Sequence, residues 1–436
     1  MPAVVTGSGA VRIGLLGCGT VGQAVVRTLN EGGATIERAS GHRLEVGPIL
    51  VRDPRKARPG VDRSLVTTDP ERVLGDPDVS IVVEVMGGLD PTRDYLETAL
   101  ARGKSVVTAN KQLLSRHGPE LLEAAQRAGA ELRFEASACA AIPVIQGLRE
   151  ALLAAEITAV TGIVNGTTNF ILTEMARGGL SYDAALARAQ ELGYAEADPT
   201  EDVGGADAAA KMAILSSIAF HSRVRLDDVP YEGIDRLEAE DLERAESLGF
   251  VVKLLGVARL HDGAMSVRVH PALVPRGHRL AAVAGPDNAV LLESRATREI
   301  MLVGPGAGGD ETASAVVADV LSILGTHQGS FLHNALADAG RPVLPPDEVR
   351  SAFYVRMSVA DRPGVLARVA SAFAEEHLSI RTVVQSGAGD EARLVMVLHE
   401  GPEGRMRAAV ARMAGLEEVR GEPVVLRVVG SGAGDP

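Results

Sequence analysis

Val11-Arg-Ile-Gly-Leu-Leu-Gly17-Cys-Gly19-Thr-Val-Gly22 is the stretch that decides the fold of the N-terminal part of the chain. An apolar run leads into glycines spaced G-x-G-x-x-G, and a helical pattern follows. The first glycine permits a tight turn, the second lets a pyrophosphate approach the backbone, and the third allows close helix–strand packing. The following helix offers unpaired N–H groups to phosphates. The stretch therefore predicts a dinucleotide site whose contacts are Gly17, Gly19, Thr20, Val21 and Gly22.

Short β-branched runs continue to alternate with helical patterns as far as about Ala140, which is typical of a doubly wound α/β sheet. The predicted strands are Val11–Leu16, Val46–Val51, Ile81–Val85, Ser105–Thr108 and Glu131–Phe134. We assign residues 1–141 to this Rossmann domain.

The pattern then changes to long helices followed by strands, which predicts a second α+β domain over residues 142–303. Helices are expected at Tyr182–Leu192 and Ala206–Phe220, and strands at Met265–Val269, Val290–Glu293 and Ile300–Val303. The glycine-rich turn Gly304–Gly309 opens a further helix, so residues 304–340 are expected to return to the first domain. After the proline-rich linker Arg341–Pro346, residues 350–430 follow a βαββαβ order, which predicts a ferredoxin-like domain.

The composition excludes several classes of function. The formal net charge is −13 and there is no Trp, so nucleic-acid partners are not expected. No apolar run approaches the roughly 18 residues that a membrane helix needs, and no signal peptide is evident. Only Cys18 and Cys139 are present, which favours a reducing compartment. We expect a soluble, cytoplasmic protein with no membrane partner.

The second predicted strand ends at Val51-Arg52-Asp53, where a dinucleotide's adenosine ribose would lie. An acidic side chain there accepts hydrogen bonds from the ribose of NAD, whereas an arginine accommodates the 2′-phosphate of NADP. Because Arg52 is nearer the strand end, we favour NADP, with NAD as an accepted alternative. Arg55, Lys56 and Arg58 are interpreted as solvated loop charges.

Thr108-Ala-Asn-Lys111 follows another parallel strand, at the edge where such sheets bind ligands. Lys111 would begin a helix, where the helix dipole disfavours a cation. This placement favours a functional role, so Thr108 and Lys111 join the predicted cofactor contacts.

The densest chemistry lies between Gly193 and Lys211. Asp207 and Lys211 are four residues apart and share one face of a helix that is apolar almost all round. A buried charge pair is expensive, so we interpret it as functional rather than as a solvated surface pair. Glu196 and Asp202 lead into it.

A dehydrogenase suits this arrangement. The dinucleotide takes the hydride, and a positioned side chain takes or gives the proton. A partly buried lysine whose pKa is lowered by desolvation serves that purpose. The carboxylates would hold a substrate ammonium group and hydroxyl.

These motifs resemble the homoserine dehydrogenase family, in the form that carries a C-terminal ACT domain. The resemblance covers roughly Val11 to Val429 and is most specific from Gly193 to Lys211; Asn165–Leu172 and Thr108–Lys111 are also similar to family segments. It implies interconversion of L-homoserine and L-aspartate 4-semialdehyde and a middle domain that also dimerises. The implied catalytic residues are Lys211, Asp207 and Lys111, and the implied substrate ligands are Glu196, Asp202 and Asp207. Which lysine transfers the proton stays open.

The resemblance further implies that Gly306 and Gly308 approach the nicotinamide. It implies a monovalent cation, sodium, held by Glu135 and the backbone carbonyls of Ala138, Ala140 and Ile142. This sequence has Cys139-Ala140-Ala141 where many relatives are glycine-rich. Spacing alone would not have suggested this cation site.

The ACT resemblance centres on Asp361-Arg-Pro-Gly364. It implies an amino-acid effector, and we expect threonine because it is an end product of the pathway. The alternative is that this domain only dimerises. A homodimer or homotetramer is expected.

Two rival functions remain. Cys139 would be a nucleophile in an aspartate-semialdehyde dehydrogenase, although a small core cysteine is the simpler interpretation. A non-catalytic sensor of NADP and an amino acid is the other, but it would not require Asp207 and Lys211 on a buried helix.

Overall fold

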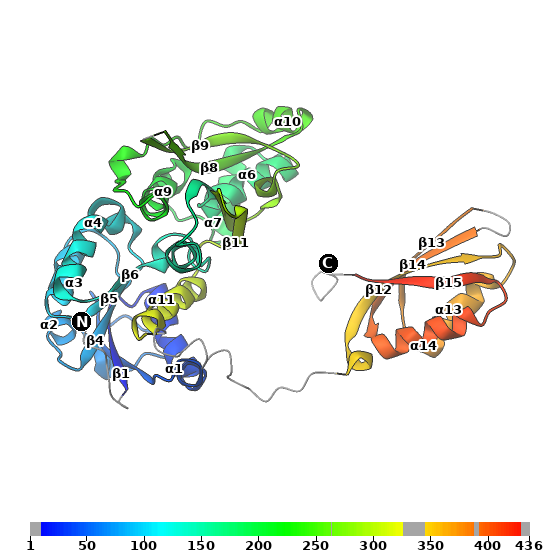
Figure 1. Cartoon of the computed structure of the whole chain (residues 1–436), viewed down its shortest axis with the longest axis horizontal. Helices are drawn as coiled ribbons and strands as arrows, with labels where there is room; N and C mark the ends of the chain where they lie inside the picture. Colours follow the sequence, from blue (N-terminus) through cyan, green and yellow to red (C-terminus); the bar gives the residue numbers. More distant parts are fainter. Residues whose placement is uncertain (1–9, 263, 326–344, 388–391, 429–436) are drawn as a thin grey trace. The chain divides into compact units, whose positions relative to one another are not determined.

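The structure is a computed structural model that describes residues 10–262, 264–325, 345–387 and 392–428. It divides into two compact units, residues 1–337 and 338–436, and each is described by itself (Figure 1). Most of the proline-rich linker lies outside the described residues. The described part of the chain contains no helix long and apolar enough to cross a membrane.

The first unit begins with a six-stranded parallel sheet in the order β3-β2-β1-β4-β5-β6. This is the strand order of a dinucleotide-binding Rossmann fold, so the predicted fold class is confirmed. Its strands are β1 (Val11–Leu16), β2 (Leu44–Leu50), β3 (Val66–Thr67), β4 (Val79–Glu84), β5 (Ser105–Thr108) and β6 (Leu132–Arg133). The helices between them are α1 (Thr20–Ser40), α2 (Glu71–Leu74), α3 (Thr92–Ala101) and α4 (Lys111–Ala128).

The glycine turn after β1 has the geometry that its spacing predicts. Gly17 has φ +101°, and a Cβ there would lie 2.8 Å from the backbone of Met86. A Cβ on Gly22 would lie 2.6 Å from the carbonyl oxygen of Gly17, so any side chain would push α1 off the strand. A Cβ on Gly19 would meet nothing within 4 Å, which leaves that side of the turn open.

The middle of the first unit is a five-stranded antiparallel sheet in the order β11-β10-β7-β8-β9. Its strands are β7 (Ile157–Ile163), β8 (Phe250–His261), β9 (Ala264–Pro275), β10 (Asp287–Ser294) and β11 (Arg298–Pro305). The α-helices of this region are α5 (Val144–Gln146), α6 (Gly166–Gly178), α7 (Tyr182–Glu191), α8 (Thr200–Val203), α9 (Ala206–Ala219) and α10 (Ala239–Ser247).

The chain then returns to the first sheet, as the sequence predicts. Helix α11 (Gly309–Ile323) buries Ala313, Val316 and Val320 in the same hydrophobic core as Val25 and Leu29 of α1. Because of this return, the turn between β11 and α11 lies against the glycine turn: a Cβ on Gly309 would lie 3.0 Å from the Thr20 side chain.

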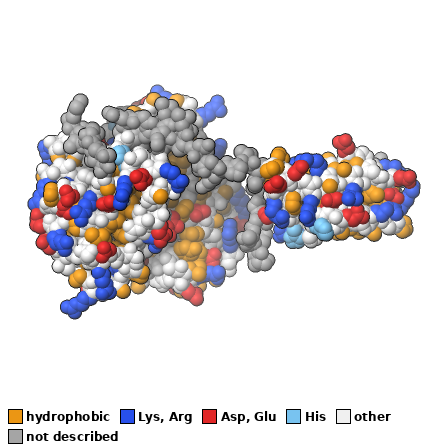
Figure 2. All heavy atoms as spheres, turned by 90° about the horizontal axis from the view of Figure 1, so that it is seen from below, with side chains coloured by type: hydrophobic (Ala, Val, Ile, Leu, Met, Phe, Trp, Pro, Cys, Tyr) orange, Lys and Arg blue, Asp and Glu red, His pale blue; other side chains and the backbone are white. Residues whose placement is uncertain are grey.

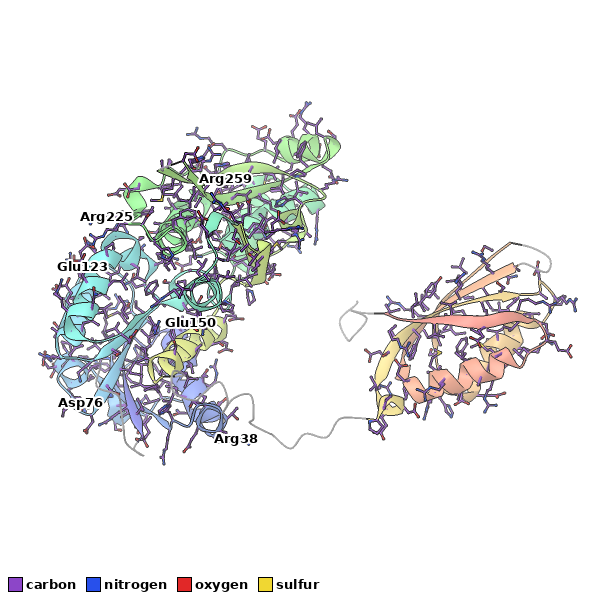
Figure 3. All side chains as sticks on the ribbon, viewed as in Figure 1. Arg38, Asp76, Glu123, Glu150, Arg225 and Arg259 are labelled. Carbon is purple, nitrogen blue, oxygen red and sulfur yellow. The ribbon has the colours of Figure 1, made fainter. Side chains whose placement is uncertain are left out.

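Ion pairs also join the helices beside the parallel sheet to the middle region of the first unit. Arg225, which follows α9, donates to Glu120 of α4 at 2.7 Å. Arg223 pairs with Glu123, and Figure 3 shows Glu123 and Arg225 at this junction. On the face drawn in Figure 2, acidic and basic side chains are interspersed, as such surface pairs require.

The second unit is a four-stranded antiparallel sheet in the order β13-β14-β12-β15 with two helices. Its elements are β12 (Arg350–Val359), α13 (Val365–Glu375), β13 (Ile380–Ser386), β14 (Ala392–Pro402), α14 (Glu403–Ala414) and β15 (Val419–Val428). The predicted ferredoxin-like order is confirmed. Phe353 and Phe373 are fully buried at its core.

Candidate active site

Helix α9 carries two charged side chains into the protein interior. It is apolar almost all round, and eleven of its residues are buried, including Asp207 and Lys211. The exposed fraction of the whole residue is 3 % for Asp207 and 7 % for Lys211. The predicted buried pair is therefore confirmed, and the carboxylate Oδ2 lies 3.0 Å from the Lys211 ammonium.

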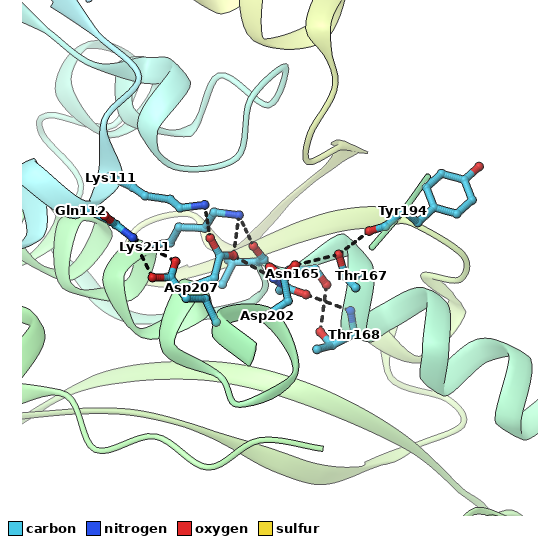
Figure 4. A network of polar contacts seen from close by, with 11 residues as sticks. Lys111, Gln112, Asn165, Thr167, Thr168, Tyr194, Asp202, Asp207 and Lys211 are labelled. Atoms are coloured by element: carbon cyan, nitrogen blue, oxygen red, sulfur yellow. Dashed lines mark hydrogen bonds and ion pairs between the residues drawn. The ribbon is translucent and has the colours of Figure 1, made fainter. Parts of the chain in front are cut away.

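Asp207 contacts two lysines from different layers of the first unit (Figure 4). Lys111, the first residue of α4, forms an ion pair with Oδ1, while Lys211 contacts Oδ2. Lys211 also donates to the carbonyl oxygen of Val164 at 2.7 Å, at the end of β7. The region of the six-stranded parallel sheet and the region of the five-stranded antiparallel sheet thus meet at one carboxylate.

The electrostatics of this cluster keep Asp207 ionised. Burial alone would raise the pKa of Asp207, but Lys211 and Lys111 outweigh burial and hold it well below its ordinary value. Burial would likewise lower the pKa of Lys111, yet the neighbouring carboxylates, Asp207 above all, raise it. Lys111 is therefore held as a cation at neutral pH.

Asn165 organises the carboxylates, a role that the sequence reasoning missed. Its Nδ2 donates to Asp202 at 2.7 Å and to Asp207 at 2.8 Å. Its Oδ1 accepts the N–H of Thr168 and so caps α6. Burial and the charge of Asp207 raise the pKa of Asp202. An asparagine suits this position because its amide donates to both acids while its oxygen serves the helix.

A cavity of about 480 Å³ brings seven of the predicted site residues together. Exposed Glu196, from the segment after α7, lines it together with Lys111 and Lys211. The other predicted residues along its wall are Val21, Ala138, Ala140 and Gly306. Lys211 therefore lines the same cavity as the segments that follow the Rossmann strands β4 and β5.

The phosphate end of the site contains a contact that the sequence interpretation missed. Arg58 donates to the carbonyl oxygen of Cys18, inside the glycine turn, at 3.0 Å. The interpretation of Arg58 as a solvated loop charge is wrong, because its side chain is half-buried and bonded to the glycine turn. Its partner lies forty residues away in the chain, so the local sequence does not indicate the contact. Arg52 is exposed in the loop after β2.

Thr108 lies at the end of β5 but is not among the residues that line the cavity. It is fully buried, and its hydroxyl donates to Glu84 at 2.5 Å. The turn after β11 contains Gly306 and Gly308, and Gly308 has φ +135°, a conformation that favours glycine. A Cβ on Gly306 would overlap the side chain of Asn288, so this turn admits no side chain there.

The loop after β6 fits the implied cation. Glu135 is buried, and its carboxylate accepts N–H groups of Ile145 at 2.8 Å and Gln146 at 2.6 Å. Burial raises its pKa to about 7. No ion pair joins it to a lysine or arginine in the described part of the chain. Ala140 has φ +42°, which is strained for a residue with a side chain. A bound monovalent cation would offset the negative charge of this buried carboxylate.

Cys139 lies inside this loop and is fully buried. Burial raises the pKa of its thiol to about 11. A nucleophilic cysteine needs an accessible thiolate, so these surroundings favour the interpretation of Cys139 as a core side chain.

A Rossmann sheet whose edge meets a lysine–carboxylate cluster across one cavity defines a dinucleotide-dependent dehydrogenase of a polar, small substrate. Family models agree in detail: residues 17–135 match the homoserine dehydrogenase NAD-binding domain, residues 143–321 match homoserine dehydrogenase, and residues 353–418 match the ACT domain. The chain belongs to the homoserine dehydrogenase family.

Individual relatives cover nearly the whole chain. It is 44 % identical to homoserine dehydrogenase of Corynebacterium glutamicum, over 95 % of this chain and 94 % of that one. The solved homoserine dehydrogenase of Thiobacillus denitrificans is 40 % identical, with a TM-score of 0.72, covering 96 % of this chain and 98 % of that one. A hyperthermophilic archaeal homoserine dehydrogenase in complex with NADPH is 27 % identical, with a TM-score of 0.62, covering 72 % and 98 %. The protein is an oxidoreductase that interconverts L-homoserine and L-aspartate 4-semialdehyde with a nicotinamide dinucleotide.

Proposed function

We propose that the reaction takes place in the cavity between Lys111, Lys211 and Glu196, with Lys211 handling the proton. The observation that supports this most strongly is that both lysines contact Asp207 at the wall of a cavity that also reaches the glycine turn. When bound there, the dinucleotide supplies the hydride acceptor or donor.

Each side chain then has a distinct task. Glu196 and Asp202 attract the substrate's ammonium group and accept hydrogen bonds from it. Asp207, whose oxygens already contact Lys111, Lys211 and Asn165, holds the two lysines in place. The Lys211 ammonium donates its proton to the carbonyl oxygen during reduction, and the amine takes it back during oxidation. Lys111 stays charged, because its pKa is raised, and stabilises negative charge on the reacting oxygen.

The test is absorbance at the reduced-nicotinamide band when the protein meets homoserine with NADP or NAD. We expect an increase with both substrates present and none when either is omitted. The proposal fails if neither cofactor gives a change across about pH 7–10, the range in which an amine base is active. Lys111→Ala with turnover below that of Lys211→Ala would assign the proton to Lys111 instead.

We further propose a preference for NADP. Arg52 is exposed beside the end of β2, and a relative is solved with NADPH. Arg52→Ala should lower kcat/KM for NADP by about tenfold, as loss of a charge-assisted hydrogen bond does, and leave kcat/KM for NAD unchanged. An equal effect on both cofactors would contradict the preference.

We propose that sodium binds at Glu135 and the carbonyls of Ala138, Ala140 and Ile142. The raised pKa of the buried Glu135 carboxylate supports this, because a cation would offset the desolvated charge. Sodium chloride should raise the unfolding temperature more than choline chloride at equal ionic strength. Glu135→Gln should remove that difference; a difference that persists would place the cation elsewhere.

In the second unit we propose an amino-acid effector, with threonine as the first candidate. The loop 361–364 leads into α13, and no side chain caps the N-terminus of this helix, so N–H groups of its first turn are offered to a carboxylate. Asp361→Ala should weaken inhibition by threonine and leave uninhibited kcat unchanged. Absence of inhibition in the unaltered protein would reject threonine. We also propose that the protein is cytoplasmic and forms a homodimer or homotetramer. Light scattering measures the mass of the assembly and distinguishes the two.

A further inference from the structure

Glu84 is a buried acid for which the proposed chemistry has no use. It is the last residue of β4, has no exposed surface, and lies at the edge of the active-site cavity beside Met86 and Gly87. Burial raises its pKa. Within the described ranges no lysine or arginine forms an ion pair with it. A buried carboxylate without an ion pair is destabilising unless hydrogen bonds offset its loss of water.

The two carboxylate oxygens of Glu84 accept hydrogen bonds from two different loops. Oε1 accepts the N–H groups of Met86 at 2.8 Å and Gly87 at 2.9 Å, in the loop after β4. Oε2 accepts the hydroxyl of Thr108 at 2.5 Å, at the end of β5. One side chain therefore connects the carboxyl ends of neighbouring strands, where an α/β sheet binds its ligand.

The connection continues into the helix that carries Lys111. The Thr108 oxygen accepts the N–H of Asn110 at 3.0 Å, and the Asn110 amide donates to the carbonyl oxygen of Gly88 at 2.7 Å. The Asn110 Oδ1 accepts the N–H of Leu113 and so caps α4. Lys111 is the next residue. The network thus fixes the start of α4 against the loop after β4.

This geometry excludes a direct role for Glu84 in proton transfer. Both of its oxygens already accept hydrogen bonds, and its lack of exposed surface keeps substrate out of reach. We propose that Glu84 is a positioning residue: with Thr108 it holds the loop of Met86 and Gly87 and the start of α4 at the cofactor end of the cavity. The inference rests on the proposed use of that cavity.

The sharpest test alters the hydrogen bond and keeps the volume. Thr108→Val removes the hydroxyl, Thr108→Ser keeps it, and Glu84→Gln replaces an acceptor by a donor. For each variant the measurements are kcat, KM for NADP, KM for homoserine, NADPH affinity from its fluorescence, and the unfolding temperature. The double variant E84Q/T108V completes a cycle.

Thr108→Val should weaken NADPH binding and raise KM for NADP by about tenfold, since a hydrogen bond to a charged group is lost. KM for homoserine should change by less than about twofold. The acids proposed to bind the substrate lie elsewhere, in the middle region of the first unit. Thr108→Ser should restore both constants. The double variant should be no worse than E84Q alone, because both changes break one bond.

A purely structural role would lower the unfolding temperature of Thr108→Val and leave kcat and both KM values of the folded enzyme unchanged. That result, or equal KM values for the Val and Ser variants, would overturn the inference alone. If the unaltered protein bound NADPH and turned over homoserine, the proposed function would survive this failure. If the unaltered protein did neither, the proposed function would fail and the inference with it.

Discussion

Helices α9 and α10 of the first unit each carry an acidic and a basic residue four positions apart, and only the pair on α9 belongs to the candidate active site. On α10, Glu240 and Arg244 are joined at 2.9 Å, with 62 % and 73 % of their side chains exposed. On α9, Asp207 and Lys211 are joined at 3.0 Å, with 2 % and 9 % exposed. The spacing is identical and the surroundings differ. Burial and a third charge, Lys111 of α4, distinguish the pair on α9 from the common surface pair on α10.

The largest expected effect comes from removing the basic member of each pair. Lys211→Ala should lower kcat for homoserine oxidation by about a thousandfold, since a positioned proton carrier contributes that much. Arg244→Ala, the matched control, should leave kcat within about twofold because its charge is solvated. Steady-state rates measure both, with circular dichroism to confirm folding. Equal rates for the two variants would show that burial does not distinguish the pairs.

Removing the acidic members tests stability. Asp207→Asn leaves Lys111 and Lys211 without their counter-charge and should lower the free energy of unfolding by about 3 kcal/mol. Glu240→Gln should change it by less than about 0.5 kcal/mol. Urea titrations followed by circular dichroism give both values. If the two substitutions were equally harmless, the buried carboxylate would not be the centre of the cluster.

Acid should affect the buried pair specifically. The pKa of Asp207 is held far below its unfolded value of about 3.9, so its stabilising contribution is complete above roughly pH 4. As pH falls further, the unfolded state binds the proton first and that contribution is lost. Unfolding temperatures between about pH 5 and 2 should therefore fall less steeply in Asp207→Asn than in the unaltered protein. Parallel curves would contradict this.

The smallest effect concerns salt. A double-mutant cycle on Glu240 and Arg244 should give under about 0.5 kcal/mol, vanishing near 1 M salt where screening acts within about 3 Å. The coupling between Asp207 and Lys211 should persist there, because little solvent reaches it. Equal salt dependence would mean that α9 opens to water.

The sequence predicts the parts of this molecule whose physics is local. The glycine turn is one: Gly17, Gly19 and Gly22 are required by contacts within a single strand–turn–helix. The buried pair on α9 is another, because its apolar neighbours are visible in the same fourteen residues. Strand β8 was missed, since a continuous apolar run has no period that distinguishes strand from helix.

The rest of the site depends on contacts between distant residues. Asn165 joins two acids 37 and 42 positions away, and Arg58 reaches the phosphate turn across forty residues. Glu84 meets Thr108 across 24. No local pattern marks these residues, because each looks like an ordinary polar side chain until the fold places its partner. Thr108 shows the converse: its position at a strand end was correct, but its hydroxyl contacts Glu84.

The most direct measurement is a crystal structure of the enzyme with homoserine and NADP bound. We predict that the Lys211 Nζ lies within hydrogen-bonding reach, about 3 Å, of the homoserine hydroxyl oxygen, on the side facing the nicotinamide. A hydroxyl bound only to Lys111 or to water, with Lys211 still turned to Val164 and Asp207, would contradict the assignment of the proton transfer to Lys211.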